Sequence, residues 1–133
     1  MIKSIVLIVF LTIGVFAKST VVDKETGLMW QDSSNIVKKD WNSAKSYCKN
    51  LSLGGYSDWF LPNIDELMSI SDKKRYKPAI KKIFKNTENS YYWSSSNYKN
   101  DSSQAWNVGF GSGDDRYSNK LRKRYVRCVR ERQ

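Results

Sequence analysis

Histidine is absent from this sequence of 133 residues, and only two residues are cysteine. Without histidine, the Ser-His-Asp and Cys-His arrangements that activate most serine and cysteine nucleophiles are excluded. The sequence also lacks internal repeats, low-complexity tracts and any stretch typical of a domain linker. We therefore expect one compact domain that is not an enzyme and needs no cofactor.

Long apolar runs are scarce as well. The longest, Ile5–Phe16, has about twelve residues, whereas a membrane-spanning helix needs roughly 20. Lys3 precedes this run and Val15-Phe16-Ala17 suits a cleavage site, so residues 1–17 are predicted to be a signal peptide. No cysteine follows the run, which disfavours a lipid anchor, and an uncleaved N-terminal anchor is the alternative. The mature domain, residues 18–133, should be exported to the periplasm or the cell surface.

Acidic side chains are the minority, with 13 Asp and Glu against 23 Lys and Arg. Removing Lys3 with the signal peptide leaves 22 basic side chains and does not change the acidic count. Such a charge balance favours anionic partners and solubility, and it says nothing about the fold. Charge alone would also allow nucleic acid, but export argues against that partner.

The two cysteines are Cys48 and Cys128. In an exported chain the default prediction is one disulfide between them, and two free buried thiols are the alternative. A bridge over about 80 residues would stabilise the fold by roughly 4–5 kcal/mol in the chain-entropy description.

The first half of the mature chain predicts two short strands, 20–23 and 28–31, joined by a turn at Gly27. Asp40 can cap a helix with Trp41, Ala44 and Cys48 on its apolar face, and Gly54-Gly55 should end it.

A central motif, GGYSDWFLPNIDEL, covers Gly54–Leu67. Asn63 and Glu66 have the spacing of a capping box, which predicts a second helix over 64–70. Pro78–Phe84 suggests two further helical turns. The rest of the chain predicts strands over 91–96, 105–110 and 125–130, with a turn at 111–115. The expected class is α+β, with two main helices and short antiparallel strands.

Six sequence blocks resemble one known family. They are TGLMWQ at 26–31, the 41–48 helix, the central motif, YWSSS at 92–96, the AWNVGF strand and VRCVR at 126–130. In this order they resemble the Lcl C-terminal domain family, long catalogued as a domain of unknown function. The motif positions that carry the structural part of the resemblance are Trp30, Trp41, Gly55, Asp58, Trp59, Pro62, Trp93 and Trp106.

The resemblance implies a C-type-lectin-like fold and an exported protein. A well-characterised relative is an adhesin whose collagen-like stalk carries this domain, which trimerises and binds sulfated glycosaminoglycans. This chain departs from the family at Phe60, where an Arg is usual, so packing would replace a polar contact there. It also has no Gly-X-Y stalk, which leaves trimerisation, and the avidity it would give, open.

Two basic clusters are the main functional signal. Guanidinium groups bind sulfate, carboxylate and phosphate oxygens in a bidentate manner, whereas lysines act as point charges. Arg122, Arg124 and Arg130 could also line one face of a strand. The alternative is solvated charge that keeps an exported domain soluble. The candidate ligand-binding residues are Lys73, Lys74, Arg75, Lys77, Lys81, Lys82 and Lys85, and then Arg122, Lys123, Arg124, Arg127 and Arg130.

Aromatic and acidic side chains offer weaker candidates. Tyr91, Tyr98 and Tyr117 lie near polar loops and could stack on sugar rings, whereas the five tryptophans are expected in the core. Paired carboxylates near the central motif or at Asp114-Asp115 could serve a hydrolase, and Asp101, Asp114 and Asp115 could bind a calcium ion. Local hydrogen bonds explain them more simply: Asp58 to a turn, Glu66 within the capping box. We therefore predict no catalytic residue and no metal site.

The sequence thus favours an exported, non-enzymatic module that recognises an anionic, sulfated polysaccharide in adhesion. The alternative is an envelope-associated protein that binds an anionic envelope polymer, a lipid surface or a protein partner.

Overall fold

The computed structural model describes residues 19–131, so the predicted signal peptide lies outside the described residues. No helix within this range is long and apolar enough to cross a membrane. In chain order the elements are β1 (Thr20–Val22), β2 (Leu28–Gln31), β3 (Lys38–Lys39), α2 (Trp41–Lys49), α3 (Ile64–Ser69), β4 (Tyr91–Asn97), β5 (Gln104–Gly109), β6 (Asp114–Asn119), β7 (Arg124–Tyr125) and β8 (Val129–Glu131).

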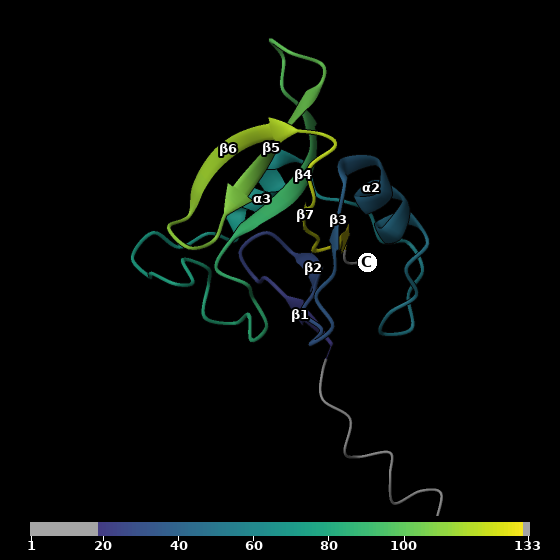
Figure 1. The fold of residues 1–133 in the computed structure, drawn as a ribbon. Coiled ribbons are helices and arrows are strands. Elements are labelled where there is room, and N and C mark those ends of the chain that lie inside the picture. The colour runs from purple at the N-terminus through teal and green to yellow at the C-terminus, as the bar shows by residue number, and fades with distance from the viewer. Residues whose placement is uncertain (1–18, 132–133) are drawn as a thin grey trace, which may run out of the picture.

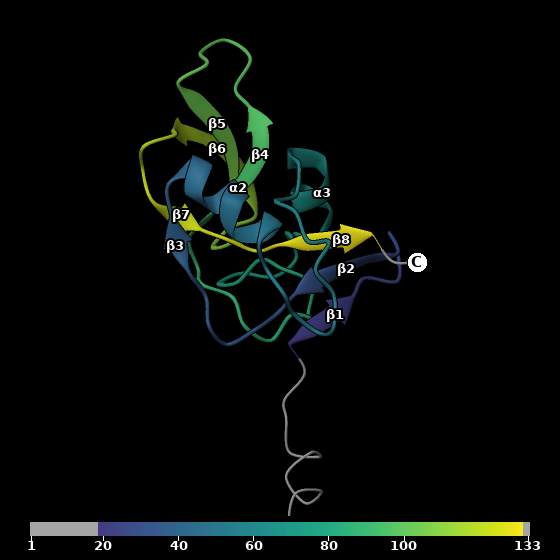
Figure 2. The same ribbon diagram turned by 90° about the vertical axis from the view of Figure 1, so that its right-hand side faces the viewer.

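The strands form two sheets. The larger has five strands in the order β3-β7-β4-β5-β6, and the smaller has three in the order β1-β2-β8. All pairs are antiparallel except β4 and β7, which run parallel. Figure 1 shows β4, β5 and β6 side by side as a curved sheet, with the β1–β2 hairpin below it. In Figure 2, α2 and α3 lie on either side of β4.

The β1–β2 hairpin matches the sequence prediction. Gly27 has φ of 78°, a conformation that residues with a β-carbon adopt at a cost. The buried Asp23 carboxylate accepts hydrogen bonds from the Glu25 backbone N–H and the Thr26 hydroxyl, both at 3.2 Å. The turn therefore folds around its own aspartate.

Helix α2 begins where the sequence predicts and ends earlier. The Asp40 carboxylate accepts a 2.9 Å hydrogen bond from the Ser43 backbone N–H, as an N-cap should. That hydrogen bond lowers the pKa of Asp40. The helix ends at Asn50, so the prediction that Gly54-Gly55 stops it is wrong. The two glycines instead form a separate turn, with φ of 62° and 86°.

Helix α3 has the predicted capping box. The Asn63 side chain accepts from the Glu66 backbone N–H and the Glu66 side chain accepts from the Asn63 backbone N–H, both at 2.8 Å. These reciprocal bonds satisfy two N–H groups that a helix start leaves without intrahelical partners.

The expected fold, a C-type-lectin-like α+β domain with two main helices, is wrong. The helices have only nine and six residues, and most of the regular structure lies in the two sheets. The predicted helical turns over Pro78–Phe84 do not form, because the backbone there bonds to other elements. Ala79 N–H donates to the Phe110 carbonyl and Lys81 N–H donates to the Ile70 carbonyl. Helices and strands are still mixed, as the class predicts.

The C-terminal part also differs from expectation. Strand β6 was not predicted, because its sequence, DDRYSN, is polar on both faces. It can be polar because it is an edge strand and mostly exposed. The predicted strand over 125–130 is two short strands, β7 and β8, that belong to different sheets.

Two apolar clusters lie on opposite faces of β4. Tyr92 joins Leu67, Ile70 and Phe110 in one cluster, whereas its neighbour Trp93 points to the other. The second cluster holds the Cys48–Cys128 disulfide, with a Cα–Cα distance of 5.5 Å and a separation of 80 residues. The disulfide prediction is confirmed, and the bridge ties α2 to the chain between β7 and β8.

Candidate functional site

The central motif is structural. Leu53 and Tyr56 pair across the Gly54-Gly55 turn, and the indole N–H of Trp59 donates to both their carbonyls, at 3.3 and 3.1 Å. Trp59 is 3% exposed. The backbone of Phe60, at the position where the resemblance suggested an Arg, pairs with Val129 of β8, and its side chain packs against the first apolar cluster. Pro62, which follows, is buried.

Arg130, a candidate ligand-binding residue, is engaged inside the protein. Its guanidinium donates to both Asp58 oxygens, at 2.6 and 3.0 Å, and lies 3.7 Å from the centroid of the Tyr56 ring. The side chain of Arg130 is 4% exposed, whereas that of Asp58 is 59% exposed. This hydrogen bond lowers the pKa of the Asp58 carboxyl. The prediction that Asp58 binds a turn backbone is therefore wrong.

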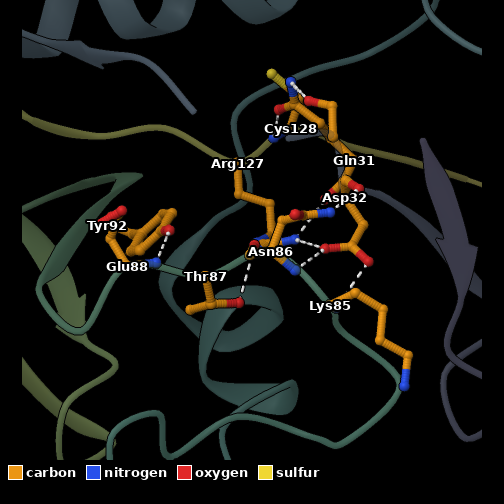
Figure 3. Close-up of polar contacts among 10 residues, drawn as sticks. Gln31, Asp32, Lys85, Asn86, Thr87, Glu88, Tyr92, Arg127 and Cys128 are labelled. Carbon is orange, nitrogen blue, oxygen red and sulfur yellow. Dashed lines mark hydrogen bonds and ion pairs between the residues drawn. The ribbon is translucent and has the colours of Figure 1, made fainter. Parts of the chain in front are cut away.

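Arg127 is the centre of a buried polar network (Figure 3). Its guanidinium donates to the Gln31 carbonyl at 2.6 Å, to the Thr87 hydroxyl at 2.9 Å, and to the Asn86 carbonyl. It also lies 3.3 Å from a carboxylate oxygen of Asp32. Both charged side chains are at most 6% exposed. Arg127 and Arg130 are thus held inside the protein by carboxylates and are not available to a ligand at the surface.

The 73–85 cluster is exposed but partly neutralised. Lys81 is paired with Asp23 at 2.9 Å and with Glu25 at 2.5 Å, and Lys73 lies 3.5 Å from Asp114. An open recess of about 570 Å³ borders Arg75, Lys81 and Lys82, but Glu25 and Asp72 line it as well. The remaining members, Lys74, Lys77 and Lys85, point outward on this long connection.

The 122–124 cluster runs into β7, the strand that lies between β3 and β4 in the five-stranded sheet. The Arg124 guanidinium lies 5.3 Å from the centroid of the Tyr91 ring and donates to the Ser118 hydroxyl at 3.2 Å. Partial burial lowers the pKa of Arg124, and the charge of nearby Arg122 lowers it further. A cation held next to another cation is stabilised when an anion binds between or beside them.

Arg116 extends this cluster across the sheet. It stands on β6 opposite Asn107 and two residues from Ser118, so strand alternation places it on the face that Arg124 contacts. Arg116 and Tyr91 border a recess of about 130 Å³. We call Tyr91, Arg116, Arg122 and Arg124 the arginine face. The expected strand ladder of Arg122, Arg124 and Arg130 is wrong, because Arg122 lies in a turn and Arg130 faces Asp58.

Gly109 shapes this face. A β-carbon at this position would lie 2.9 Å from Cε1 of Tyr91, which is closer than such atoms approach. The Tyr91 ring therefore lies directly on the Gly109 backbone, and Gly109 sets its height above the sheet. Tyr91 stands opposite Gly109 in the β4–β5 pairing, so the arrangement follows from strand register.

Two lysines of this region, Lys38 and Lys39, were missed by the sequence analysis. Lys38 and Lys39 form β3 and stand opposite Tyr125 and Arg124 of β7. Lys123, a predicted candidate next to Arg124, is exposed. The pairing of Lys38 and Lys39 with β7 brings together segments that lie about 85 residues apart, so no local pattern could have indicated it.

The tryptophan prediction holds for four residues and is wrong for Trp106. Trp30, Trp41, Trp59 and Trp93 are at most 6% exposed. Trp106 is only partly buried and packs against Tyr98 and Tyr117. Among residues 19–131 no three metal-ligating side chains gather, and Asp101 accepts from Ser103 and Gln104 of its own turn.

The family model of the Lcl C-terminal domain matches residues 19–130, which is nearly the whole of the described range. No curated protein matches the sequence.

Proposed function

Since the chain belongs to the Lcl C-terminal domain family, we propose that it is an exported, non-enzymatic binding module that recognises an anionic, sulfated polysaccharide. The arginine face would be the contact surface. The signal-peptide pattern of residues 1–17 supports export, and the absence of histidine supports a binding role.

One observation carries the proposal. Within residues 19–131 the ion pairs to carboxylates involve Lys73, Lys81, Arg127 and Arg130, and none involves the three arginines of the arginine face. Arg124 lies on the Tyr91 ring and near Arg122, and Arg116 borders the same recess as Tyr91, which Asp114 also lines. A sulfate group placed there would gain charge-assisted hydrogen bonds from planar donors that match its oxygens.

The mechanism has a long-range and a short-range part. The excess of basic side chains attracts a polyanion, and this attraction weakens as salt shortens the Debye length. At contact, Arg124 is already ordered by Tyr91 and Ser118, so binding costs it little side-chain entropy. Arg122 and Arg116 would engage neighbouring sulfate or carboxylate groups of the same chain.

The test compares retention of the mature, oxidised domain on heparin and on desulfated heparin over a salt series. The double substitution Arg122→Ala, Arg124→Gln should weaken heparin binding about tenfold or more, because each charge-assisted contact contributes about 1.5–3 kcal/mol. Gln at 124 keeps a donor for Ser118. The matched control is Lys24→Ala, Lys49→Ala, which removes the same charge from exposed positions elsewhere.

Two results would contradict the proposal. One is equal retention of the wild type on both matrices, which would favour the alternative of an envelope-associated protein with another partner. The other is an equal loss of heparin retention in the double variant and in the charge-matched control. That result would show that only the overall positive charge matters and that the arginine face is not a specific site. Loss confined to Lys74, Lys77 and Lys82 alanine variants would move the site to the 73–85 cluster.

A further inference from the structure

Asn107 is a buried polar side chain in the middle of the five-stranded sheet. It stands on β5, which lies between β4 and β6 (Figure 1), and it is 0% exposed. Its register partners are Trp93 of β4 and Arg116 of β6, so it lies on the same face of the sheet as Arg116. Trp93, and Ala105 two residues before Asn107, both belong to the second apolar cluster. An apolar side chain at position 107 would therefore extend that cluster.

The amide of Asn107 is only half bonded. Its Nδ2 group donates a 2.7 Å hydrogen bond to the Ser118 hydroxyl, whereas its Oδ1 atom has no hydrogen-bond partner among residues 19–131. A buried amide oxygen without a partner costs free energy, and an apolar side chain of the same shape would avoid this cost. The stability of the fold therefore does not explain why an asparagine occupies this position.

Ser118 connects Asn107 with the arginine face. Its hydroxyl also accepts a hydrogen bond from Nη2 of Arg124, at 3.2 Å. Arg124 belongs to β7 and Ser118 to β6, and β4 and β5 lie between these two strands in the sheet. The Arg124 side chain thus extends across the face to reach Ser118. Because the Ser118 oxygen accepts from both Asn107 and Arg124, its two lone pairs are in use and its place is fixed.

Arg124 lies where its charge is not favoured. Partial burial lowers its pKa, and the charge of Arg122 lowers it further. Its Nε–H has no partner within the part of the chain that the structure describes. The guanidinium is held by the Ser118 hydroxyl, by the Tyr91 ring, and by a longer contact of 3.4 Å from Nη1 to the Lys123 carbonyl. Without the bond to Ser118 it could turn towards water, where its charge is better solvated.

We propose that Asn107 and Ser118 are positioning residues, which hold Arg124 in the orientation that binds a sulfate or carboxylate group. This inference rests on the proposed function. Asn107 holds the Ser118 hydroxyl, and the hydroxyl holds one end of the guanidinium. The guanidinium then need not be ordered when an anion arrives, which strengthens binding. The stability lost at the half-bonded amide is exchanged for a preorganised anion contact.

A buried asparagine can also serve the fold alone, by fixing the register of a strand. The register of β5 is fixed here by other residues. Gly109 lies under the Tyr91 ring, and Val108 belongs to the first apolar cluster, so a slip by one residue would move both to the wrong face. Register also gives no reason for a hydroxyl that joins the Asn107 amide to a cation. These observations favour the positioning role.

The first experiment measures binding of a heparin octasaccharide by the mature, oxidised domain. Ser118→Ala and Asn107→Leu should each weaken binding about threefold to tenfold, because Arg124 must then be ordered on binding. Ser118→Thr keeps the hydroxyl and should bind like the wild type. The matched control is Ser46→Ala, which removes a hydroxyl from an exposed position on α2. In an Arg124→Ala background, Ser118→Ala should cause no further loss, because it acts through Arg124.

Thermal unfolding separates positioning from a merely structural role. Asn107→Leu should leave the melting temperature unchanged or raise it by up to about 6 °C, because an apolar side chain replaces a half-bonded buried amide. A lower melting temperature of Asn107→Leu together with unchanged octasaccharide binding overturns the inference. So does a loss of binding in Ser118→Ala that has the same size in the Arg124→Ala background.

Side-chain NMR of Arg124 tests the inference without a ligand. In the wild type its Nε–H signal should exchange slowly with water and have a heteronuclear NOE as high as that of the ordered backbone. In Ser118→Ala the signal should become as mobile as that of the exposed Arg122. An unchanged Arg124 signal in Ser118→Ala overturns the inference. If this signal responds as expected but the wild type does not bind the sulfated octasaccharide, the proposed function is overturned and the positioning of Arg124 is supported.

Discussion

Replacement of Arg127 by methionine is the most informative perturbation of the fold. Methionine has a similar length and no charge, so the change removes the guanidinium with little loss of packing. The Asp32 carboxylate, in a side chain 6% exposed, would lose its cationic partner. The carbonyls of Gln31 and Asn86 would lose their donor as well. The substitution therefore leaves a buried charge and two buried acceptors incompletely bonded.

The expected cost is about 3–5 kcal/mol, the range found when one partner of a buried ion pair is removed. Asp32 keeps the backbone N–H groups of Lys85 and Asn86, each at 2.9 Å, which reduces the cost. The two unpaired carbonyls raise it again, by roughly 1 kcal/mol or more each. For a domain of this size the melting temperature should fall by roughly 10–25 °C.

Urea and thermal unfolding followed by tryptophan fluorescence measure this cost. The companion variants are Asp32→Asn and the double substitution, whose combined loss should be smaller than the sum of the single losses. Lys82→Met is the matched control, because Lys82 is exposed and its side chain makes no contact in the network. If Arg127→Met lowers the free energy of unfolding by less than about 1 kcal/mol, the conclusion that this buried ion pair and its hydrogen bonds stabilise the fold is refuted.

Two further predictions concern the other polar contacts. The Arg130 guanidinium lowers the pKa of Asp58, so this pair stabilises the fold above the ordinary value of 3.8 and the contribution is lost as pH falls through the lowered folded value. The Asp58→Asn variant has no carboxyl to titrate, so its urea midpoint should fall less between pH 7 and pH 2 than that of the wild type. An equal fall in the two proteins would contradict this prediction. Asn63→Ala should lower the free energy of unfolding by about 0.5–2 kcal/mol, because Glu66 N–H loses its acceptor. Asn63→Ser should restore most of it, and an equal loss in the two variants would argue against the cap.

The sequence predicted correctly those features that depend only on residues close together in the chain. The cap at Asp40, the capping box at Asn63 and the positive φ at Gly27 depend on residues within three positions of one another. The disulfide followed from the number of cysteines and the expected compartment. Helical turns were predicted over Pro78–Phe84 because its apolar spacing suits a helix, yet its N–H groups bond to Ile70, just after α3, and to Phe110.

The candidate site was predicted only in part. Arg122 and Arg124 were identified from charge, and Tyr91 from its polar surroundings. Charge alone could not separate these arginines from Arg127 and Arg130, because burial depends on where β2 and the central motif pack. Lys38 and Lys39 were missed for the same reason, since they come to lie beside Tyr125 and Arg124 only through the pairing of β3 with β7.

By itself the sequence determined the two helix caps, the β1–β2 hairpin and the chemistry available to the fold: a basic domain without histidine and with one pair of cysteines. Those features depend on residue type and short-range hydrogen bonds. The tertiary structure decided which charges are free. It neutralised Arg127 and Arg130 with carboxylates about 70 to 95 residues away, and among residues 19–131 it left Arg116, Arg122 and Arg124 without an ion pair. A charge is neutralised by whatever approaches it in space, and contacts over such separations exist only in the folded chain.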